Sequence, residues 1–243
     1  MVLTSEPSAC NARTVHDFTD SGLGTAPLVS YDLQHFYIIY GALDGNIKLY
    51  ASHDQGLTWT GPTIVVAGNA FQSTIAGPLA YEGGALTCPG TNVAIDGRGH
   101  LHLLYIDSAK FVPMYTKSRD NGATWSMPVN VNPERATDPH MWPCLSCTRD
   151  GDLQGGSVVF NATLGKYSIL VHSKPEDEDE WTTSEADNGP WAAAGPSPSF
   201  RIGFGDYFDC DSLPDSEISV MAWSETANGL QPWQSFVRIL ELD

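Results

Sequence analysis

The sequence predicts an all-β protein, a β-propeller built of four-stranded antiparallel blades. One observation is an eight-residue motif, Ser-x-Asp-x-Gly-x-Thr-Trp, that occurs twice, at 52–59 and at 118–125. A second is that short apolar or alternating runs surround each copy and are separated by Asp-Gly and Asn-Gly turns, which is the pattern of hairpins. The third is composition: 23 glycines, 16 prolines and 10% aromatic residues favour many short strands joined by turns.

The first predicted blade lies near 27–67. Its core strand is 35–42, an aromatic and β-branched run typical of a buried strand. An Asp-Gly-Asn turn leads into an alternating strand at 47–52, the first motif closes the next turn, and 63–67 completes the unit. The preceding segment, 1–26, is expected to be a connector or a remnant strand.

The second predicted blade lies near 91–131 and repeats the pattern. Its core strand, 101–106, reads LHLLYI, and a third strand at 112–117 leads into the second motif. Between the two blades, residues 68–90 are rich in glycine, proline, alanine and serine. A loop of that length is often functional, so we expect an insertion over one face.

A third blade is predicted near 157–199, after a connector at 132–156 that contains two cysteines. Its core strand is 167–172, and a degenerate copy of the motif is expected at 187–191. The unbroken acidic run at 176–180 is predicted to be a solvated loop held open by charge repulsion.

A fourth blade is predicted near 205–241, with strands at 218–223 and 236–240. Four units of about 40–60 residues each match one propeller blade apiece. A β-sandwich is the main structural alternative. It does not explain why the same turn recurs after the third strand of successive units.

Charge and hydropathy exclude several partners. The chain has 12 basic and 29 acidic residues, a formal net charge of −17. This balance argues against nucleic acid, whose phosphates require basic patches, and against anionic membrane surfaces. No apolar run is long enough to insert into a membrane, and residues 1–13 lack the features of a signal peptide.

The sequence predicts no metal site and no cofactor. The Cys144-x-x-Cys147 pair has no second pair with which to complete a zinc site, so it is expected to form a local disulfide or to remain as two free thiols. His140 and His172 have no partners at ligand spacing and are interpreted as structural or surface residues. One carboxylate per motif is too few oxygen ligands for calcium.

The repeated motif itself is interpreted as a stabilised turn. The aspartate accepts backbone N–H groups, the glycine takes a positive φ, the two hydroxyls tie the arms together, and the tryptophan packs on the layer beneath. The residues concerned are Ser52, Asp54, Gly56, Thr58 and Trp59 in the first copy, and Ser118, Asp120, Gly122, Thr124 and Trp125 in the second.

Both copies resemble the Asp-box, or BNR repeat, of the sialidase superfamily of β-propellers, and the turn at 96–101 also resembles that family's blade pattern. The resemblance covers 27–240. It implies six blades, whereas four are recognisable. Either residues 1–26 and the insertions contain further strands, or the propeller is incomplete at its N-terminus. It also implies that the boxes lie away from the central site, and it favours a secreted or extracellular location.

For activity, the resemblance implies a tyrosine nucleophile made basic by a glutamate, an aspartate as acid/base, and three arginines that grip a sialate carboxylate. Tyr207, at the opening of the fourth unit, is the candidate nucleophile, with Glu225 and Asp206 beside it in the catalytic set. The alternative is that Tyr207 is a packed or ligand-stacking tyrosine. Arg201, Arg135 and Arg149 are the candidate substrate-binding arginines. Arg119 lies inside a box and Arg98 in a tight turn, which sets them aside.

The expected partner is therefore a glycan or glycoconjugate, and the most specific expectation is a glycoside hydrolase of the exo-sialidase type that acts at the central funnel. A non-catalytic module that binds carbohydrate or protein is the alternative, favoured by the scarcity of basic residues. An incomplete gene product without independent function is a third reading. The sequence does not indicate an oligomeric state.

Overall fold

A computed structural model of the chain describes residues 22–68, 92–107, 109–161, 166–186, 191–192, 204–213, 215–216, 218–225 and 234–241. These residues form four antiparallel sheets, each made from consecutive strands. The first sheet contains β1 (Gly22–Val29), β2 (Phe36–Ala42), β3 (Ile47–Ser52) and β4 (Thr60–Val66). The second contains β5 (Val93–Ile95), β6 (Leu101–Ile106), β7 (Pro113–Ser118) and β8 (Val129–Asn130).

A short 3-10 helix, η1 (Pro133–Arg135), connects the second sheet to the third. The third sheet contains β9 (His140–Cys147), β10 (Leu153–Asn161), β11 (Lys166–Lys174) and β12 (Thr182–Glu185), and β13 (Trp191–Ala192) also pairs with β11. In the fourth sheet the described strands are β14 (Phe204–Ser212), β15 (Ile218–Glu225) and β16 (Gln234–Glu241).

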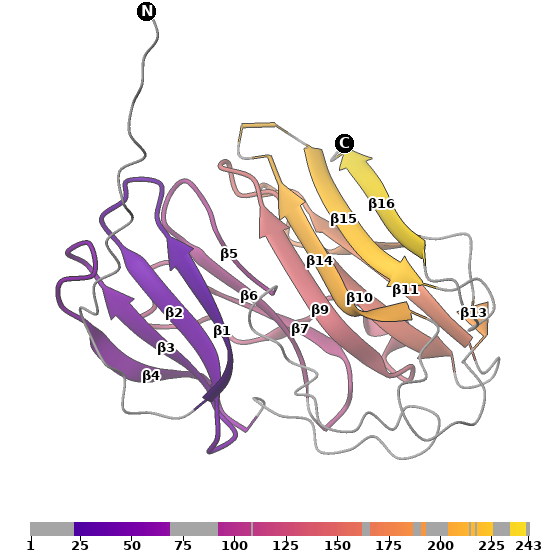
Figure 1. The fold of residues 1–243 in the computed structure, drawn as a ribbon, viewed down its shortest axis with the longest axis horizontal. Helices are drawn as coiled ribbons and strands as arrows, with labels where there is room; N and C mark the ends of the chain where they lie inside the picture. The colour runs from indigo at the N-terminus through magenta and orange to yellow at the C-terminus, as the bar shows by residue number, and fades with distance from the viewer. Residues whose placement is uncertain are drawn as a thin grey trace, which may run out of the picture.

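The four sheets are the blades of a β-propeller. Within each sheet the strands follow one another in chain order, and Figure 1 shows the sheets arranged one after another, with β9 and β14 side by side and pointing the same way. The first strand of every sheet lines one shared cavity, which is therefore the central channel of the propeller. The fold class predicted from the sequence is confirmed.

Antiparallel order gives each sheet two distinct ends. The turn after the first strand and the turn after the third strand lie at the same end, because alternate strands run in opposite directions. We call this the box end, since the turns at 53–59 and 119–125 lie there. We call the opposite end, where β1, β5, β9 and β14 begin, the far end.

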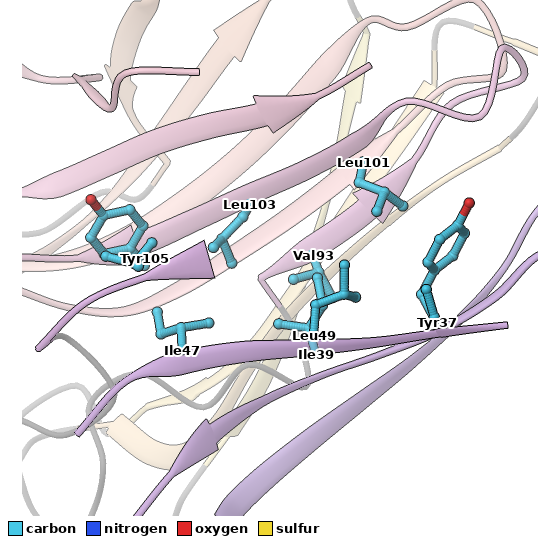
Figure 2. Close-up of a cluster of buried hydrophobic side chains, with 10 residues drawn as sticks. Tyr37, Ile39, Ile47, Leu49, Val93, Leu101, Leu103 and Tyr105 are labelled. Carbon is cyan, nitrogen blue, oxygen red and sulfur yellow. The ribbon is translucent and has the colours of Figure 1, made fainter. Parts of the chain in front are cut away.

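Apolar side chains from neighbouring sheets meet between the blades. Figure 2 shows side chains of β2, β3, β5 and β6 directed toward one another across the interface of the first and second sheets. Ile39, Leu101 and Leu103 are completely buried there. Burying one such side chain stabilises the fold by about 1.5–3 kcal/mol, so this interface holds the first two blades together.

The two boxes have the same internal hydrogen bonds. In the first, Ser52 Oγ donates to Asp54 Oδ1 at 2.9 Å and accepts the Gly56 amide at 2.8 Å, while Thr58 donates to Asp54 through its amide at 2.8 Å and its hydroxyl at 2.6 Å. The corresponding distances in the second box agree to within 0.1 Å. Each box is a closed hydrogen-bonded turn, as its sequence predicts.

The second box also contacts the preceding blade. Tyr37 of β2 donates a hydrogen bond through its hydroxyl to Asn121 Oδ1 at 3.2 Å, and Trp125 packs against the apolar cluster between the first two sheets. A Cβ on Gly122 would lie 2.1 Å from Leu49 Cδ2 of β3, whereas a Cβ on Gly56 of the first box would lie 3.2 Å from its nearest neighbour.

This difference predicts unequal effects of the same substitution. Both glycines have positive φ, 81° at Gly56 and 86° at Gly122, so alanine costs about 1–2 kcal/mol of conformational strain at either position. Gly122→Ala adds overpacking against Leu49, and we expect it to lower the free energy of unfolding by about 2–4 kcal/mol, against about 1–2 kcal/mol for Gly56→Ala. Denaturant unfolding of the two variants measures the difference.

The double variant Gly122→Ala/Leu49→Ala provides the control. Removing the Leu49 branches relieves the overpacking, so the two substitutions should together cost less than the sum of their separate effects. Equal losses for Gly56→Ala and Gly122→Ala, or strict additivity with Leu49→Ala, would contradict the proposed contact between the box and the first blade.

The start of the third sheet corrects the sequence prediction. The segment 132–156 was expected to be a connector, but β9 occupies His140–Cys147 and β10 begins at Leu153. Thus the third sheet begins before 157. The reason is that its inner strand carries Pro143 and its second strand carries Gly155-Gly156, which hide the apolar alternation of a strand.

The place of a box in the third sheet is also different from the one predicted. The turn from the third to the fourth strand is 175–181, between β11 and β12, not 187–191. Residues 187–190 lie outside the described part, and Trp191 begins β13. Trp181 ends the turn and packs edge-on against Tyr115 of the second sheet, with ring centroids 5.1 Å apart. Trp181 thus packs against the preceding sheet as Trp125 does in the second sheet. The acidic residues 176–180 are exposed, as predicted.

At the N-terminal side, β1 begins at Gly22, so part of the predicted connector 1–26 belongs to the first blade. The predicted insertion at 68–90 lies, apart from Gly68, outside the described residues. No helix in the described ranges has the length and apolar character needed to cross a membrane.

Candidate functional site: the central channel

The channel between the inner strands is the candidate site. It encloses a cavity of about 350 Å³ to which all four sheets contribute, through β1 and its following turn, β5, β9 and β14. Backbone and apolar side chains form part of the wall. The polar and ionisable side chains at the cavity are Tyr31, Ser146, Cys147, Asp209, Asp211 and Ser212. Its volume falls within the range of small-molecule sites.

Arg149 joins the four blades at the box end of the channel. It lies in the first turn of the third sheet, and its guanidinium stacks over the Tyr31 ring of the first sheet, 5.0 Å from the centroid. Its Nη1 donates to Asp215 Oδ1 of the fourth sheet at 3.0 Å. Its carbonyl accepts the Gly97 amide of the second sheet at 2.7 Å. First turns from all four sheets therefore meet at one residue.

This junction depends on a glycine. A Cβ at Gly97 would lie 2.7 Å from the Arg149 carbonyl oxygen, so a side chain there would force the two turns apart. Burial raises the pKa of Tyr31, which keeps its phenol neutral beneath the guanidinium. The box end of the channel is thus held by stacking, an ion pair and a backbone hydrogen bond.

Two carboxylates on β14 provide the acidic side chains of the channel. Asp209 and Asp211 are separated by one residue, so they lie on the same face of the strand. Asp209 lines the cavity, and partial desolvation, together with the charge of Asp211, raises its pKa. A carboxyl group with a raised pKa beside a second carboxylate is an arrangement that general acid–base chemistry uses.

The opposite face of β14 fastens the fourth sheet to the third. Ser212 donates to Ser146 Oγ on β9 at 2.7 Å and lies 2.6 Å from Ser219 Oγ on β15. Cys210, on the same face, is buried. Thus both faces of β14 border the channel, and the face that carries Cys210 and Ser212 also joins β14 to β9.

The candidate catalytic residues lie at the far end of the fourth sheet. Asp206 and Tyr207 are close to the start of β14, and Glu225 is the last residue of β15, where it pairs with Phe204. The strand register therefore brings these three positions to the same end of one sheet, away from the boxes.

The candidate arginines are not gathered in one place. Arg135 ends η1 at the far end and is engaged by two carboxylates, with Nε 3.0 Å from Asp138 Oδ2 and Nη1 3.3 Å from Glu185 Oε1. Arg149 lies at the box end, as described above. Arg201 lies outside the described residues.

The two histidines interpreted as structural are joined by a serine. Ser157 Oγ on β10 lies 2.9 Å from His140 Nδ1 on β9 and 2.9 Å from His172 Nε2 on β11, and His172 Nδ1 lies 3.0 Å from Thr183 Oγ1. His140, Ser157 and His172 are completely buried. Without access to solvent or substrate, this chain of hydrogen bonds is part of the core, which fits the structural interpretation.

No group of three or more ligating side chains that would hold a metal ion occurs in the described part of the chain. Cys144, Cys147 and Cys210 are free thiols, so the second of the two alternatives for the Cys144-x-x-Cys147 pair holds. Sequence reasoning missed Tyr31, Ser146, Asp209, Asp211 and Ser212. Of these residues, only Asp209, Asp211 and Ser212 belong to a pattern that can be seen in the sequence, the Asp-Cys-Asp-Ser alternation of β14.

Comparison with known proteins supports the fold class. No known protein family matches the sequence, and no curated protein is significantly similar to it. Among solved structures, an endo-arabinase from Bacteroides thetaiotaomicron is similar, with a TM-score of 0.51 and 16% identity over 90% of this chain and 75% of that one. An α-L-arabinofuranosidase, Arb93A, from Fusarium graminearum in complex with an iminosugar inhibitor has a TM-score of 0.52 and 13% identity over 90% of this chain and 62% of that one. At these identities the similarity defines the chain as a β-propeller and no more.

Proposed function

We propose that the protein is directed at glycans and binds a saccharide in the central channel, entering from the far end. The observation that carries this proposal is the wall of the channel, where hydroxyl and carboxylate groups of Tyr31, Ser146, Asp209, Asp211 and Ser212 converge on one cavity. Sugar hydroxyls are recognised by such groups because each accepts or donates hydrogen bonds. The Arg149 junction lies across the box end, so the entry is proposed at the far end.

Glycoside hydrolysis is the reaction that this lining supports best. It needs a carboxylic acid to protonate the leaving oxygen and a second carboxylate as base or nucleophile. Asp209, with its raised pKa, is suited to the acid role, and Asp211 to the second role. In the exo-sialidase version of the proposal, Tyr207 is the nucleophile, Glu225 its base and Asp206 the acid/base, all from the far end of the fourth sheet.

A neutral saccharide is favoured over a sialoside. Binding a sialate carboxylate calls for guanidinium groups free to make bidentate contacts, but Arg135 is already paired with two carboxylates and Arg149 with Asp215. The aspartates of the channel would also repel an anionic sugar. Arabinose-containing glycans enter the proposal because the similar structures include an endo-arabinase and an α-L-arabinofuranosidase.

A panel of substrates tests the proposal. The purified protein is assayed with a fluorogenic sialoside, a fluorogenic α-L-arabinofuranoside and arabinan, and its variants Asp209→Asn and Tyr207→Phe are assayed beside it. Asp44→Asn, at an exposed turn of the first sheet, is the matched control for loss of one negative charge. If Asp209 is the general acid, Asp209→Asn should lower turnover about 10²–10⁴-fold while Asp44→Asn leaves it unchanged.

The outcomes separate the versions. Sialoside turnover that Tyr207→Phe abolishes supports the exo-sialidase version. Arabinoside or arabinan turnover that depends on Asp209 supports the neutral-glycan version. Saccharide binding on a glycan array without turnover, lost in Asp209→Asn, supports the alternative of a non-catalytic carbohydrate-binding module. If the protein shows neither turnover nor saccharide binding, a glycan-directed function is overturned and a protein-binding module is left.

A further inference from the structure

Two buried thiols meet between the inner strands of the third and fourth sheets. Cys144 on β9 and Cys210 on β14 lie on contacting strands, and the Cys210 thiol is near enough to Cys144 to raise its pKa. Both residues are buried, Cys144 completely and Cys210 at 9% exposure. Cys210 lines the central cavity, and its Sγ also lies 3.8 Å from the Gln154 carbonyl oxygen.

The register of the two strands supports this contact independently. β9 and β14 run side by side in the same direction, and Ser146 Oγ lies 2.7 Å from Ser212 Oγ. Residues two apart on a strand lie on the same face. Cys144 is two residues before Ser146, and Cys210 is two residues before Ser212, so the two cysteines face each other as the two serines do. Cys147 differs from Cys144 by an odd number of positions and packs in the cluster between the second and third sheets.

We propose that Cys144 and Cys210 are a site of oxidative modification, at which a peroxide that enters the channel converts the two thiols into an intramolecular disulfide. Of the two thiols, that of Cys210 reacts first, because Cys210 lines the cavity and Cys144 does not. One equivalent of hydrogen peroxide oxidises its sulfur to the sulfenic acid and is reduced to water. The Cys144 sulfur then displaces hydroxide, which leaves as a second water with the thiol proton. The balance is two thiols and one peroxide to one disulfide and two waters.

The bond would tie the inner strands of two blades beside the channel. Burial and the neighbouring Cys210 thiol raise the pKa of Cys144, so little thiolate is present at neutral pH and closure should be slow. This inference does not depend on the proposed function, since it concerns the wall of the channel and not its ligand.

Peptide mapping without reduction tests the proposal. The folded protein is incubated with hydrogen peroxide, alkylated and digested with trypsin. Cys144 and Cys147 fall in one tryptic peptide, because no lysine or arginine separates them, so the variant Cys147→Ser assigns the bond. We expect a cross-linked peptide that joins this segment to the one containing Cys210, retained in Cys147→Ser and lost in Cys144→Ser and Cys210→Ser.

A melting curve gives a second readout on the unmodified sequence. Closing a loop between the third and fourth sheets should raise the Tm by roughly 5–10 °C relative to the reduced protein, and dithiothreitol should reverse the shift. A bond from Cys147, or loss of thiols without a cross-linked peptide, would overturn the proposal. So would a peroxide-treated protein that keeps both thiols.

Discussion

Asp96→Ala should lower the free energy of unfolding by about 3–5 kcal/mol, because it removes the acceptor for several buried donors at once. The Asp96 side chain, in the first turn of the second sheet, is 2% exposed. Its Oδ1 accepts the amides of Arg98 at 2.9 Å and His100 at 2.8 Å, and its Oδ2 lies 2.8 Å from His100 Nδ1. The turn that places Arg98 and Gly97 against the third sheet is built on this one carboxylate.

The folded protein stabilises the charged form of Asp96. Burial by itself would raise the pKa of Asp96, but the interactions with His102 and the His100 amide outweigh it and lower the pKa to about 2. His102 Nε2 lies 3.6 Å from Asp96 Oδ2. Asp96→Asn keeps the shape but replaces one acceptor oxygen with a donor, so we expect a loss between that of the alanine variant and zero.

Denaturant unfolding at pH 7 measures both variants. Asp44→Ala is the matched control, since Asp44 also accepts an amide two residues ahead, from Asn46 at 3.1 Å, but in an exposed turn. We expect Asp44→Ala to be far less harmful than Asp96→Ala. A similar loss of unfolding free energy in Asp96→Ala and Asp44→Ala would show that the buried Asp96 carboxylate does not hold its turn together.

The first two blades were predictable because turn and strand signals agree there. The expected strand at 101–106 coincides with β6, and the one at 47–52 coincides with β3. Each is bounded by an Asp-Gly turn or a box, and a strand placed between two strong turns has little freedom to shift its register. In the third sheet, Pro143 and the Gly155-Gly156 pair weaken the strand pattern, and its first strand was missed for that reason.

The candidate site was less predictable, because it is made by the first turns and inner strands of four separate sheets. Tyr31, Gly97, Arg149 and Asp215 are far apart in the sequence and share no spacing. Their meeting follows only from the arrangement of the four sheets around the channel. The boxes can be recognised in the sequence because each is a local turn. For the same reason they indicate the fold and not the site.

The pairing of His140 with His172 likewise depends on register. In β10, a bulge between Gly156 and Val158 shifts the pairing with β9, and Ser157 at this bulge contacts both imidazoles. No spacing in the sequence predicts a bulge at that position. The consequence for stability is large, because two neutral imidazoles are held where protonation is strongly disfavoured.

We expect the protein to lose stability steeply between about pH 6.5 and pH 5. Burial, followed by the charge of Arg135, lowers the pKa of His140 to about 4, and burial, followed by His140, lowers that of His172 to about 3. In the unfolded chain both have a pKa near 6.5. The unfolded state therefore binds more protons than the folded state in this window, so stability is fully present above about pH 6.5 and falls as the pH is lowered.

The expected loss by pH 5 is about 2 kcal/mol each for His140 and His172, or about 4 kcal/mol together. His102, whose pKa is also lowered by burial, adds to this loss. Carboxylates with lowered pKa, such as Asp96, contribute only at more acidic pH, below the ordinary value of an aspartate. The net charge of −17 acts in the opposite direction, since partial neutralisation relieves repulsion in the folded state. A measured loss near the expected value would mean that the buried imidazoles outweigh this relief.

Guanidinium unfolding from pH 7.5 to pH 5 measures the slope, and two variants of the same network assign it. His172→Gln removes one titrating group, so it should lower stability at pH 7 yet remove about 2 kcal/mol of the change between pH 6.5 and pH 5. Ser157→Ala breaks the same hydrogen bonds without removing a titrating group, so it should lower stability at pH 7 while keeping the slope. A flat profile in the original protein, or the same slope in His172→Gln, would contradict the prediction. It would mean that the two histidines take up protons in the folded state near their ordinary pKa.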